Sequence, residues 1–269
     1  PVGRSDDASA ETGAGRPRGL DMLVGMDYQL AGVYERGLTN GANALAAIQQ
    51  VVFQEGSLSM TELVKAMQDN FEDASVRAHL LAAPKWGNND QRADQWAVKL
   101  VQMRERVLNS IDEKFGGRPH TVCHVVRSLH HVDGKRIAAS PDGRYAWTPV
   151  ADSIGAQTGT ALAGPTAVLN SVLKLNAAQN YRGGYNLNLT LSKTNTTADM
   201  LLPLVETFFD GGGQELQINS FDADTLRAAR ENPGSYSDLL VRVAGFSTRF
   251  VDLSAAEQEE LIERAELIA

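Results

Sequence analysis

The histidines are the first residues to consider for metal or acid–base chemistry: His79, His120, His124, His130 and His131. His124 and His130 are six residues apart in a segment typical of a strand, so we expect both side chains on one face. A metal site needs three or four convergent ligands, and the sequence contains neither an HExxH motif nor a histidine–carboxylate pairing. We interpret the histidines as core or surface residues and predict no metal site.

Cys123 is the only cysteine of the chain, which excludes an internal disulfide and disfavours a thiolate metal cluster. Apolar and β-branched residues surround it, and His124 is the only basic residue close by. Reactive thiolates usually lie in electropositive, partly exposed places. We therefore interpret Cys123 as a small buried filler.

Two glycine-rich segments could hold an anion. Residues 211–213 follow a helix-like segment and precede no Lys-Ser or Lys-Thr pair, so they do not predict a phosphate loop. The stretch "GAQTGTALAGP", residues 155–165, leads into a helix start, where backbone N–H groups can hold an anion. A turn followed by a helix cap explains the same residues and is preferred.

A glycine interrupts an apolar run in "LLVRVAGFSTRF", residues 239–250. The leucines and valines before it favour a buried strand, whereas glycine weakens a strand. A bulge or tight turn is the usual reason for such a glycine. Spacing alone reveals no acid–base or nucleophilic constellation, and it indicates only an α/β domain.

Helical and strand-like patterns alternate along the chain, which favours an α/β protein. Helices are predicted at residues 40–54, 59–67, 90–115, 164–175, 194–209, 222–233 and 254–267. Strands are predicted at residues 120–132, 185–192, 214–220 and 239–243. Ser59 with Glu62, and Ser254 with Glu257, form capping boxes. Pro165 suits the first turn of its helix.

The composition of the chain argues against some classes of partner. The chain has 269 residues, 43% hydrophobic and 22% charged, and a net charge of -8, which argues against a nucleic-acid partner. No apolar run approaches the roughly 20 residues of a membrane span. The stretch "PVGRSDDASAETGAGRPRG" lacks the apolar region of a secretory signal. We expect no membrane partner and a cytoplasmic location.

The segment "VRVAGFS", residues 241–247, resembles the glycyl radical domain of glycyl radical enzymes, whose core pattern is Arg-Val-x-Gly followed by Tyr or Phe. The flanking stretches "DADTLRAARENPGSYSDLLV" and "FVDLSAAEQEELIERAE" agree with it. Further stretches resemble the pyruvate formate-lyase and glycerol dehydratase branch, in the order that the family requires. They are "GLTNGANALAAIQQVVF", "SMTELVKAMQDNFE", "PKWGNND", "ASPDGRYAWTPVADS", "GPTAVLNSVLKL" and "ELQIN". The resemblance runs from about residue 21 to the last residue.

This resemblance implies a specific fold, which the spacing of residues along the sequence does not predict by itself. It implies an α/β protein that forms the C-terminal half of a ten-stranded α/β barrel with a C-terminal glycyl radical domain. We therefore expect residues 1–20 as an N-terminal arm or tail, residues 21–190 as the half-barrel and residues 191–269 as the glycyl radical domain. Another polypeptide would complete the barrel, because half a barrel leaves exposed strand edges and apolar surface.

The resemblance also assigns chemistry to Gly245. A radical-SAM activating enzyme, with an iron–sulfur cluster and S-adenosylmethionine, would remove a Cα hydrogen, and this chain would bind no cofactor itself. A Cα radical is stabilised when it is planar and conjugated with both neighbouring peptide groups, and a Cβ would clash as the centre flattens. Arg242 and Phe246 would hold and cover the radical loop.

The sequence departs from the family at the receiving cysteine. Relatives pass the radical to a cysteine, often within Gly-Cys-x-Glu, and the resulting thiyl attacks the substrate. That pattern is absent, and Val125 stands two residues after Cys123 where a glutamate is required. The chain could be the radical-bearing subunit of a split enzyme, a portion of a larger protein, or a spare part that restores an oxygen-damaged enzyme. A non-catalytic scaffolding subunit is the alternative from a different class.

The early start of the resemblance favours the split enzyme. We predict a lyase-type radical subunit, active only with a second polypeptide that carries the thiyl cysteine, and a small organic molecule as substrate. Residues 121–128 should form an inner wall strand, with Val125 as the candidate for the substrate pocket. Dehydration, C–C, C–N or C–S cleavage and fumarate addition all stay open.

Overall fold

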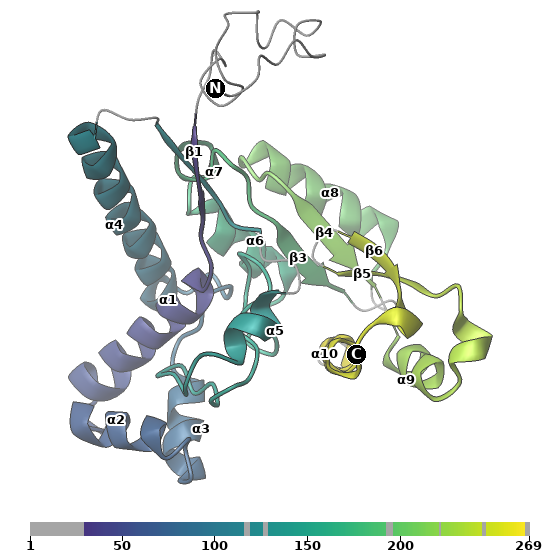
Figure 1. Ribbon diagram of the computed structural model, residues 1–269, viewed down its shortest axis with the longest axis horizontal. Helices are drawn as coiled ribbons and strands as arrows, with labels where there is room; N and C mark the ends of the chain where they lie inside the picture. The colour runs from purple at the N-terminus through teal and green to yellow at the C-terminus, as the bar shows by residue number, and fades with distance from the viewer. Residues whose placement is uncertain are drawn as a thin grey trace, which may run out of the picture.

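The computed structural model describes residues 30–115, 119–125, 129–191, 196–220, 222–243 and 246–266. Four short parallel strands run through the middle of this fold (Figure 1). Strand β1 (Ala31–Tyr34) pairs with β2 (His120–Cys123), and β3 (Leu187–Thr190) pairs with β4 (Leu216–Asn219). A single parallel bridge between His124 and Tyr185 joins the two pairs. The strands thus form an arc in the order β1, β2, β3, β4.

The first helices lie between β1 and β2 in the chain. They are α1 (Leu38–Ala47), which continues as a π-helical segment (Ile48–Gln54), α2 (Met60–Gln68), α3 (Ala74–Ala82) and α4 (Gln91–Phe115). Helix α2 begins with the predicted capping box, in which Ser59 and Glu62 each accept a hydrogen bond from the other's backbone N–H. Helix α4 lies along the side of the molecule, next to α1 (Figure 1).

The next helices precede β3 in the chain or lie between β3 and β4. They are α5 (Leu129–Gly134), α6 (Pro165–Leu173), α7 (Ala177–Asn180) and α8 (Ala198–Asp210). Pro165 occupies the first turn of α6, as predicted, because a missing N–H costs nothing there. Pro203 lies inside α8, within the early part of that helix.

The strand predicted at residues 120–132 is only partly correct. It ends at Cys123, apart from the bridge at His124, and residues from Leu129 onward form helix α5. A short apolar run fits a strand or a buried helix equally well, so periodicity could not separate the two. The expectation that His124 and His130 share one face of a strand is therefore wrong. Residues 126–128 of the expected wall strand lie outside the described residues.

A C-terminal unit follows β4. It comprises α9 (Ala223–Glu231), an antiparallel hairpin of β5 (Leu240–Val243) and β6 (Phe246–Arg249), and α10 (Ala255–Glu266). The second predicted capping box, Ser254 with Glu257, precedes α10. This unit has its own apolar core, made by Leu226, Ala229, Val241, Phe250, Leu261, Ile262 and Ala265. Strand β5 buries one face only, because Val241 is buried and Leu240 is 61% exposed.

The main core lies between the strand arc and its helices. Its largest fully buried side chains are Trp86, Tyr181, Tyr185, Leu187 and Phe208. Burying a large apolar side chain contributes about 1.5–3 kcal/mol. Among the described residues, no helix is both long enough and apolar enough to cross a membrane. The division near residue 190 stays a prediction, and residues 1–20 lie outside the described part.

Candidate functional site

The hairpin of β5 and β6 carries the segment predicted to hold the radical. Val243 and Phe246 are register partners at the end of the two strands. Ala244 and Gly245, which lie between them in the chain, are outside the described residues, and so is the side chain of Phe246. The roles of Gly245 and Phe246 therefore stay predictions.

Arg242 connects the hairpin to the neighbouring strands. Its carbonyl oxygen accepts a hydrogen bond of 3.2 Å from Asn219 Nδ2, at the end of β4. Burial raises the pKa of Glu215 above its ordinary value. The positive charge of Arg242 lowers that pKa, but burial is the larger effect. With Val243, Arg242 lines a small cavity of about 10 Å³ that also contacts α10.

A buried ionic cluster forms the other side of this small cavity. Asp152 Oδ2 accepts hydrogen bonds from Asn188 Nδ2 at 2.7 Å and from Arg264 Nη1 at 2.8 Å. Arg264 also pairs with Glu260 on the same helix, α10. Burial lowers the pKa of Arg264, but Asp152 and Glu260 outweigh burial and raise it. Asp152 thus holds α10 against the strand arc through a charged pair.

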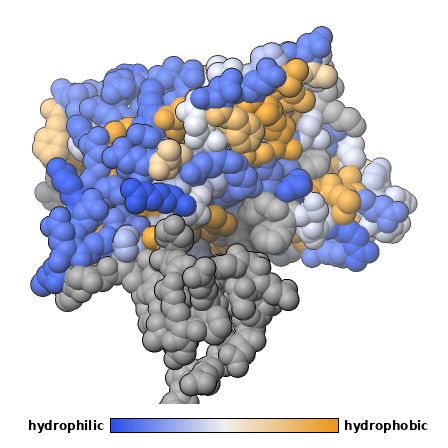
Figure 2. All heavy atoms as spheres, turned by 90° about the horizontal axis from the view of Figure 1, so that it is seen from above, coloured by the Kyte–Doolittle hydropathy of each residue, from blue (hydrophilic) through white to orange (hydrophobic). Residues whose placement is uncertain are grey.

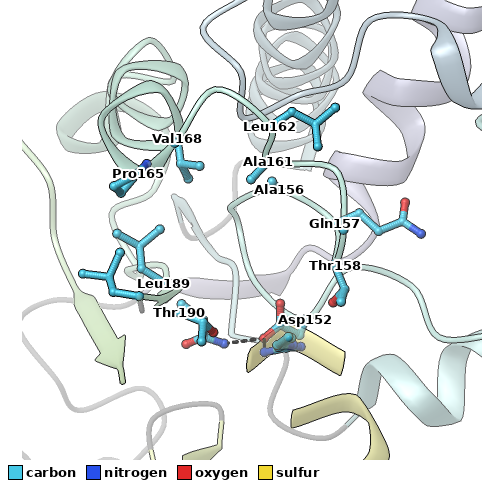
Figure 3. Close-up of a pocket in the computed structure, with 15 residues that line it drawn as sticks. Asp152, Ala156, Gln157, Thr158, Ala161, Leu162, Pro165, Val168, Leu189 and Thr190 are labelled. Atoms are coloured by element: carbon cyan, nitrogen blue, oxygen red, sulfur yellow. Dashed lines mark hydrogen bonds and ion pairs between the residues drawn. The ribbon is translucent and has the colours of Figure 1, made fainter. Parts of the chain in front are cut away.

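A larger cavity of about 290 Å³ shares Asp152, Asn188 and Arg264 with the small one. Figure 3 shows Pro165 and Val168 on one side of it, Ala161 and Leu162 across from them, and Asp152 at the far end. The cavity thus combines an apolar wall with a charged end. Such a combination suits a small organic molecule that carries a polar group.

The loop before α6 forms one wall of the larger cavity, and Asn88 holds that loop in place. Asn88 Nδ2 donates to the carbonyl oxygen of Thr160 at 2.7 Å. Asn88 Oδ1 accepts from the backbone N–H groups of Leu162, at 2.7 Å, and Ala163, at 2.9 Å. The stretch "PKWGNND" therefore positions "GAQTGTALAGP". This loop lines a cavity in addition to making the turn that its glycines predicted.

Neighbours of Asn88 hold the start of the same loop. Trp86 Nε1 donates to the carbonyl oxygen of Ile154 at 2.8 Å. Gly87 has a φ of 94°, and a Cβ there would lie 2.6 Å from Ala156 Cβ. From α1, Thr39 Oγ1 donates to the carbonyl oxygen of Gly155 at 2.8 Å. Three stretches that are far apart in the sequence thus meet at this cavity.

A second buried polar cluster lies where β1 ends. Glu35 accepts from Tyr181 Oη at 2.5 Å and pairs with Arg104 Nη1 at 2.8 Å. Burial raises the pKa of Glu35, but hydrogen bonding and charge from His124, Arg104 and Tyr181 outweigh burial and lower it. This carboxylate connects α4 and Tyr181 to the end of β1.

Cys123 and Val125 lie on or just after β2. Cys123 is buried, and burial raises the pKa of its thiol, so the thiol is protonated at neutral pH. The burial is what we expect of a filler, and that role stays a prediction. Val125 is half-buried and lines neither of the cavities described above. Its role in a substrate pocket stays a prediction.

Sequence reasoning missed the cluster between the two cavities. Asp152 and Arg264 are 112 residues apart, and no periodic pattern relates residues so distant. Both residues do lie in stretches that carried the resemblance. The expectation that no histidine pairs with a carboxylate is wrong, because His130 and His131 contact Glu260 and His120 contacts Asp112.

Comparison with known families gives two matches. A model described as pyruvate formate lyase-like matches residues 16–131, and a model described as glycine radical matches residues 150–251. An isethionate sulfite-lyase of Oleidesulfovibrio alaskensis is 35% identical over 246 residues, which cover 86% of this chain and 28% of that protein. A 4-hydroxyphenylacetate decarboxylase glycyl radical subunit of Clostridioides difficile is 33% identical over 214 residues, covering 78% of this chain and 24% of that protein.

A solved structure shares the fold. The B12-independent glycerol dehydratase of Clostridium butyricum, in its glycerol-bound form, superimposes with a TM-score of 0.82 at 30% identity. The match covers 90% of this chain and 31% of that protein. The expected α/β fold, a partial barrel with a C-terminal radical domain, is therefore confirmed. The chain spans less than a third of the length of these relatives.

Proposed function

Because this chain belongs to the glycyl radical enzymes of the pyruvate formate lyase-like family, we propose that it is the radical-bearing subunit of a split enzyme. Gly245 stores the radical, and a second polypeptide supplies the cysteine that receives it. Relatives of this chain are lyases and dehydratases. The proposed reaction is accordingly lyase-type radical chemistry on a small organic substrate.

One observation carries the proposal. The glycine radical model matches residues 150–251, a range that includes Gly245, and Val243 and Phe246, on either side of residues 244–245 in the chain, are register partners. The only cysteine, Cys123, lies at the end of β2 and has Val125, not a glutamate, two residues after it, so we assign the receiving cysteine to another polypeptide. The name of the decarboxylase subunit from Clostridioides difficile supports a division of labour between chains.

Each proposed radical step transfers one hydrogen atom. A radical generated from S-adenosylmethionine by an iron–sulfur activating enzyme takes one hydrogen atom from Gly245 Cα. In turnover, Gly245 takes a hydrogen atom from the thiol of the partner's cysteine, which restores the glycine and leaves a thiyl radical. The thiyl abstracts hydrogen from the substrate and is regenerated at the end of the cycle. This chain needs no bound cofactor for these steps.

Arg242 and Phe246 are proposed as positioning residues for the radical loop. Arg242 lines the small cavity together with Asp152 and Glu260, and against the larger effect of burial its charge lowers the pKa of Glu215. Phe246 would cover the radical and exclude oxygen. Val125 is proposed as an apolar residue of the substrate pocket that forms when the barrel is complete.

Exposed apolar side chains support a partner. On α4, Met103, Val107 and Ile111 lie four residues apart and are 51%, 52% and 44% exposed. Figure 2 shows that apolar side chains also gather in patches on one face. Within the described residues, β1 pairs with β2 only, so its other edge is open. Contiguous apolar surface and an open strand edge are typical of an interface.

The decisive experiment is anaerobic activation followed by electron paramagnetic resonance. Treatment with a radical-SAM activating enzyme and S-adenosylmethionine should give a doublet, because one hydrogen stays on the Cα of Gly245. Gly245→Ala should abolish the doublet. Gly234→Ala is the matched control, because a Cβ there meets only Asn232 Oδ1, at 4.0 Å. A doublet that survives in Gly245→Ala would contradict the assignment.

Turnover assays then distinguish the remaining functions. The activated chain alone should give the doublet without product, and addition of a polypeptide with the Gly-Cys-x-Glu loop should give product. Restored activity in an oxygen-damaged complete enzyme would indicate a spare part instead. Product formation by a complex in which this chain gives no radical doublet would indicate a scaffolding subunit.

A further inference from the structure

Two histidines and one carboxylate converge where the C-terminal unit meets the strand arc. His130 Nε2 lies 2.9 Å from Glu260 Oε2, and His131 Nε2 lies 2.7 Å from the same oxygen. The three atoms lie within 4.8 Å of one another. The side chain of His130 is 3% exposed, and those of His131 and Glu260 are each 14% exposed. We propose that His130, His131 and Glu260 bind a divalent transition-metal ion of the zinc type.

The ligand set fits that ion. Zinc takes imidazole nitrogen at about 2.0–2.1 Å and carboxylate oxygen at about 2.0–2.2 Å, and two histidines with one glutamate form a known set. Around a tetrahedral ion such ligand atoms are separated by about 3.3 Å. The nitrogen–oxygen distances therefore need to widen by only about half an ångström, a change that side-chain torsions can supply.

Two charged side chains, Arg264 and Asp152, orient the carboxylate of Glu260. Arg264 pairs with Glu260 Oε1, which leaves Oε2 facing the two histidines. Asp152 holds Arg264 from the other side at 2.8 Å. With neutral histidines, these three charged groups sum to one negative charge, which favours a dication. Partners of this kind fix the orientation of metal ligands in proteins.

The fourth position has room for water. The cavity of about 10 Å³ is lined by His130 and Glu260, and a site of this size holds about one water molecule. Val243, next to the predicted radical loop, lines the same cavity. His130 and Glu260 are 130 residues apart, so the ion would fasten α10 to α5 and thereby hold the hairpin near the strand arc.

Zinc titration of the untagged, chelator-treated chain tests this site, independently of any radical. Calorimetry should show one Zn²⁺ per chain. His131→Ala and Glu260→Gln should each weaken binding by about 100-fold or more, since even loss of a supporting partner costs 10–100-fold. His79→Ala is the matched control, because His79 faces the single carboxylate of Glu55 at 2.8 Å and should leave binding unchanged.

Two further measurements separate loss of binding from loss of folding. Circular dichroism should show that the glutamine variant keeps its helices. Co²⁺ should give the visible absorption bands of a four-coordinate site in the unaltered chain and in His79→Ala, and lose them in the other two variants. Zinc affinity that is absent, or is unaffected by His131→Ala and Glu260→Gln, would overturn the proposal and leave the cluster as ion pairs only.

Discussion

Cys123 shows how position decides the chemistry of a single side chain. It ends β2, and burial alone raises the pKa of its thiol. A protonated thiol can donate a hydrogen atom, but Cys123 lacks the glutamate of the Gly-Cys-x-Glu pattern, because Val125 stands two residues after it. Under the proposed function, the cysteine that takes part in turnover is supplied by the partner polypeptide.

Cys123→Ala tests this conclusion at the residue scale. The variant should keep the full radical doublet after activation and full turnover with a cysteine-bearing partner. Its free energy of unfolding should fall by only about 1 kcal/mol, because a small buried group is removed. Denaturant unfolding and spin quantification measure the two effects. Loss of turnover with the doublet and stability intact would place Cys123 on the radical path.

At the scale of elements, the loop before α6 depends on one amide side chain. Asn88 satisfies one carbonyl oxygen and two N–H groups of that loop. Thr160 is half-buried, whereas Leu162 and Ala163 are exposed, so each of these hydrogen bonds contributes a net stabilisation of about 0.5–1.5 kcal/mol. Asn88 therefore fixes the part of the cavity wall around residues 160–163, while Trp86 and Thr39 hold the start of the loop.

Asn88→Ala should loosen that wall. We expect faster amide hydrogen exchange over residues 155–164 and a destabilisation of about 1–3 kcal/mol. Asn88→Asp should have an intermediate effect, since its oxygens still accept from Leu162 and Ala163. Asn109→Ala on the exposed surface of α4 is the control. Exchange in the loop that matches the unaltered chain would show that the loop holds itself.

For the whole molecule, one histidine links stability to pH through the junction of α4 and β2. Burial lowers the pKa of His120, but hydrogen bonds and charge from Asp112 and Glu105 outweigh burial and raise it above 6.5. A raised pKa in the folded state means that protonated His120 stabilises the fold. This contribution is complete below the unfolded value of 6.5 and is lost as pH rises through the folded value.

His120→Gln should remove that dependence. Between about pH 6 and 8, the range in which histidine titrates, the unaltered chain should lose more stability than the variant does. Urea unfolding at several pH values measures the difference. A stability difference that stays constant, or that grows as pH rises, would contradict the prediction.

The sequence by itself determined the local elements and the identity of the radical domain. Capping pairs such as Ser59 with Glu62, and Pro165 at a first turn, specify helix starts because their partners are near neighbours. The resemblance of residues 241–247 to a glycyl radical domain was also visible in the sequence, and a glycine radical model matches residues 150–251. The switch to a helix at Leu129 was missed, since short apolar runs suit either structure.

Only the tertiary structure decided which distant side chains meet. It placed Asp152 against Arg264, and His130 and His131 against Glu260. It also showed that Asn88 holds the loop of the larger cavity. Helix caps and turns arise from hydrogen bonds between near neighbours, so the sequence shows them directly. Contacts between residues more than a hundred positions apart depend on how whole elements pack, and no local pattern records that packing.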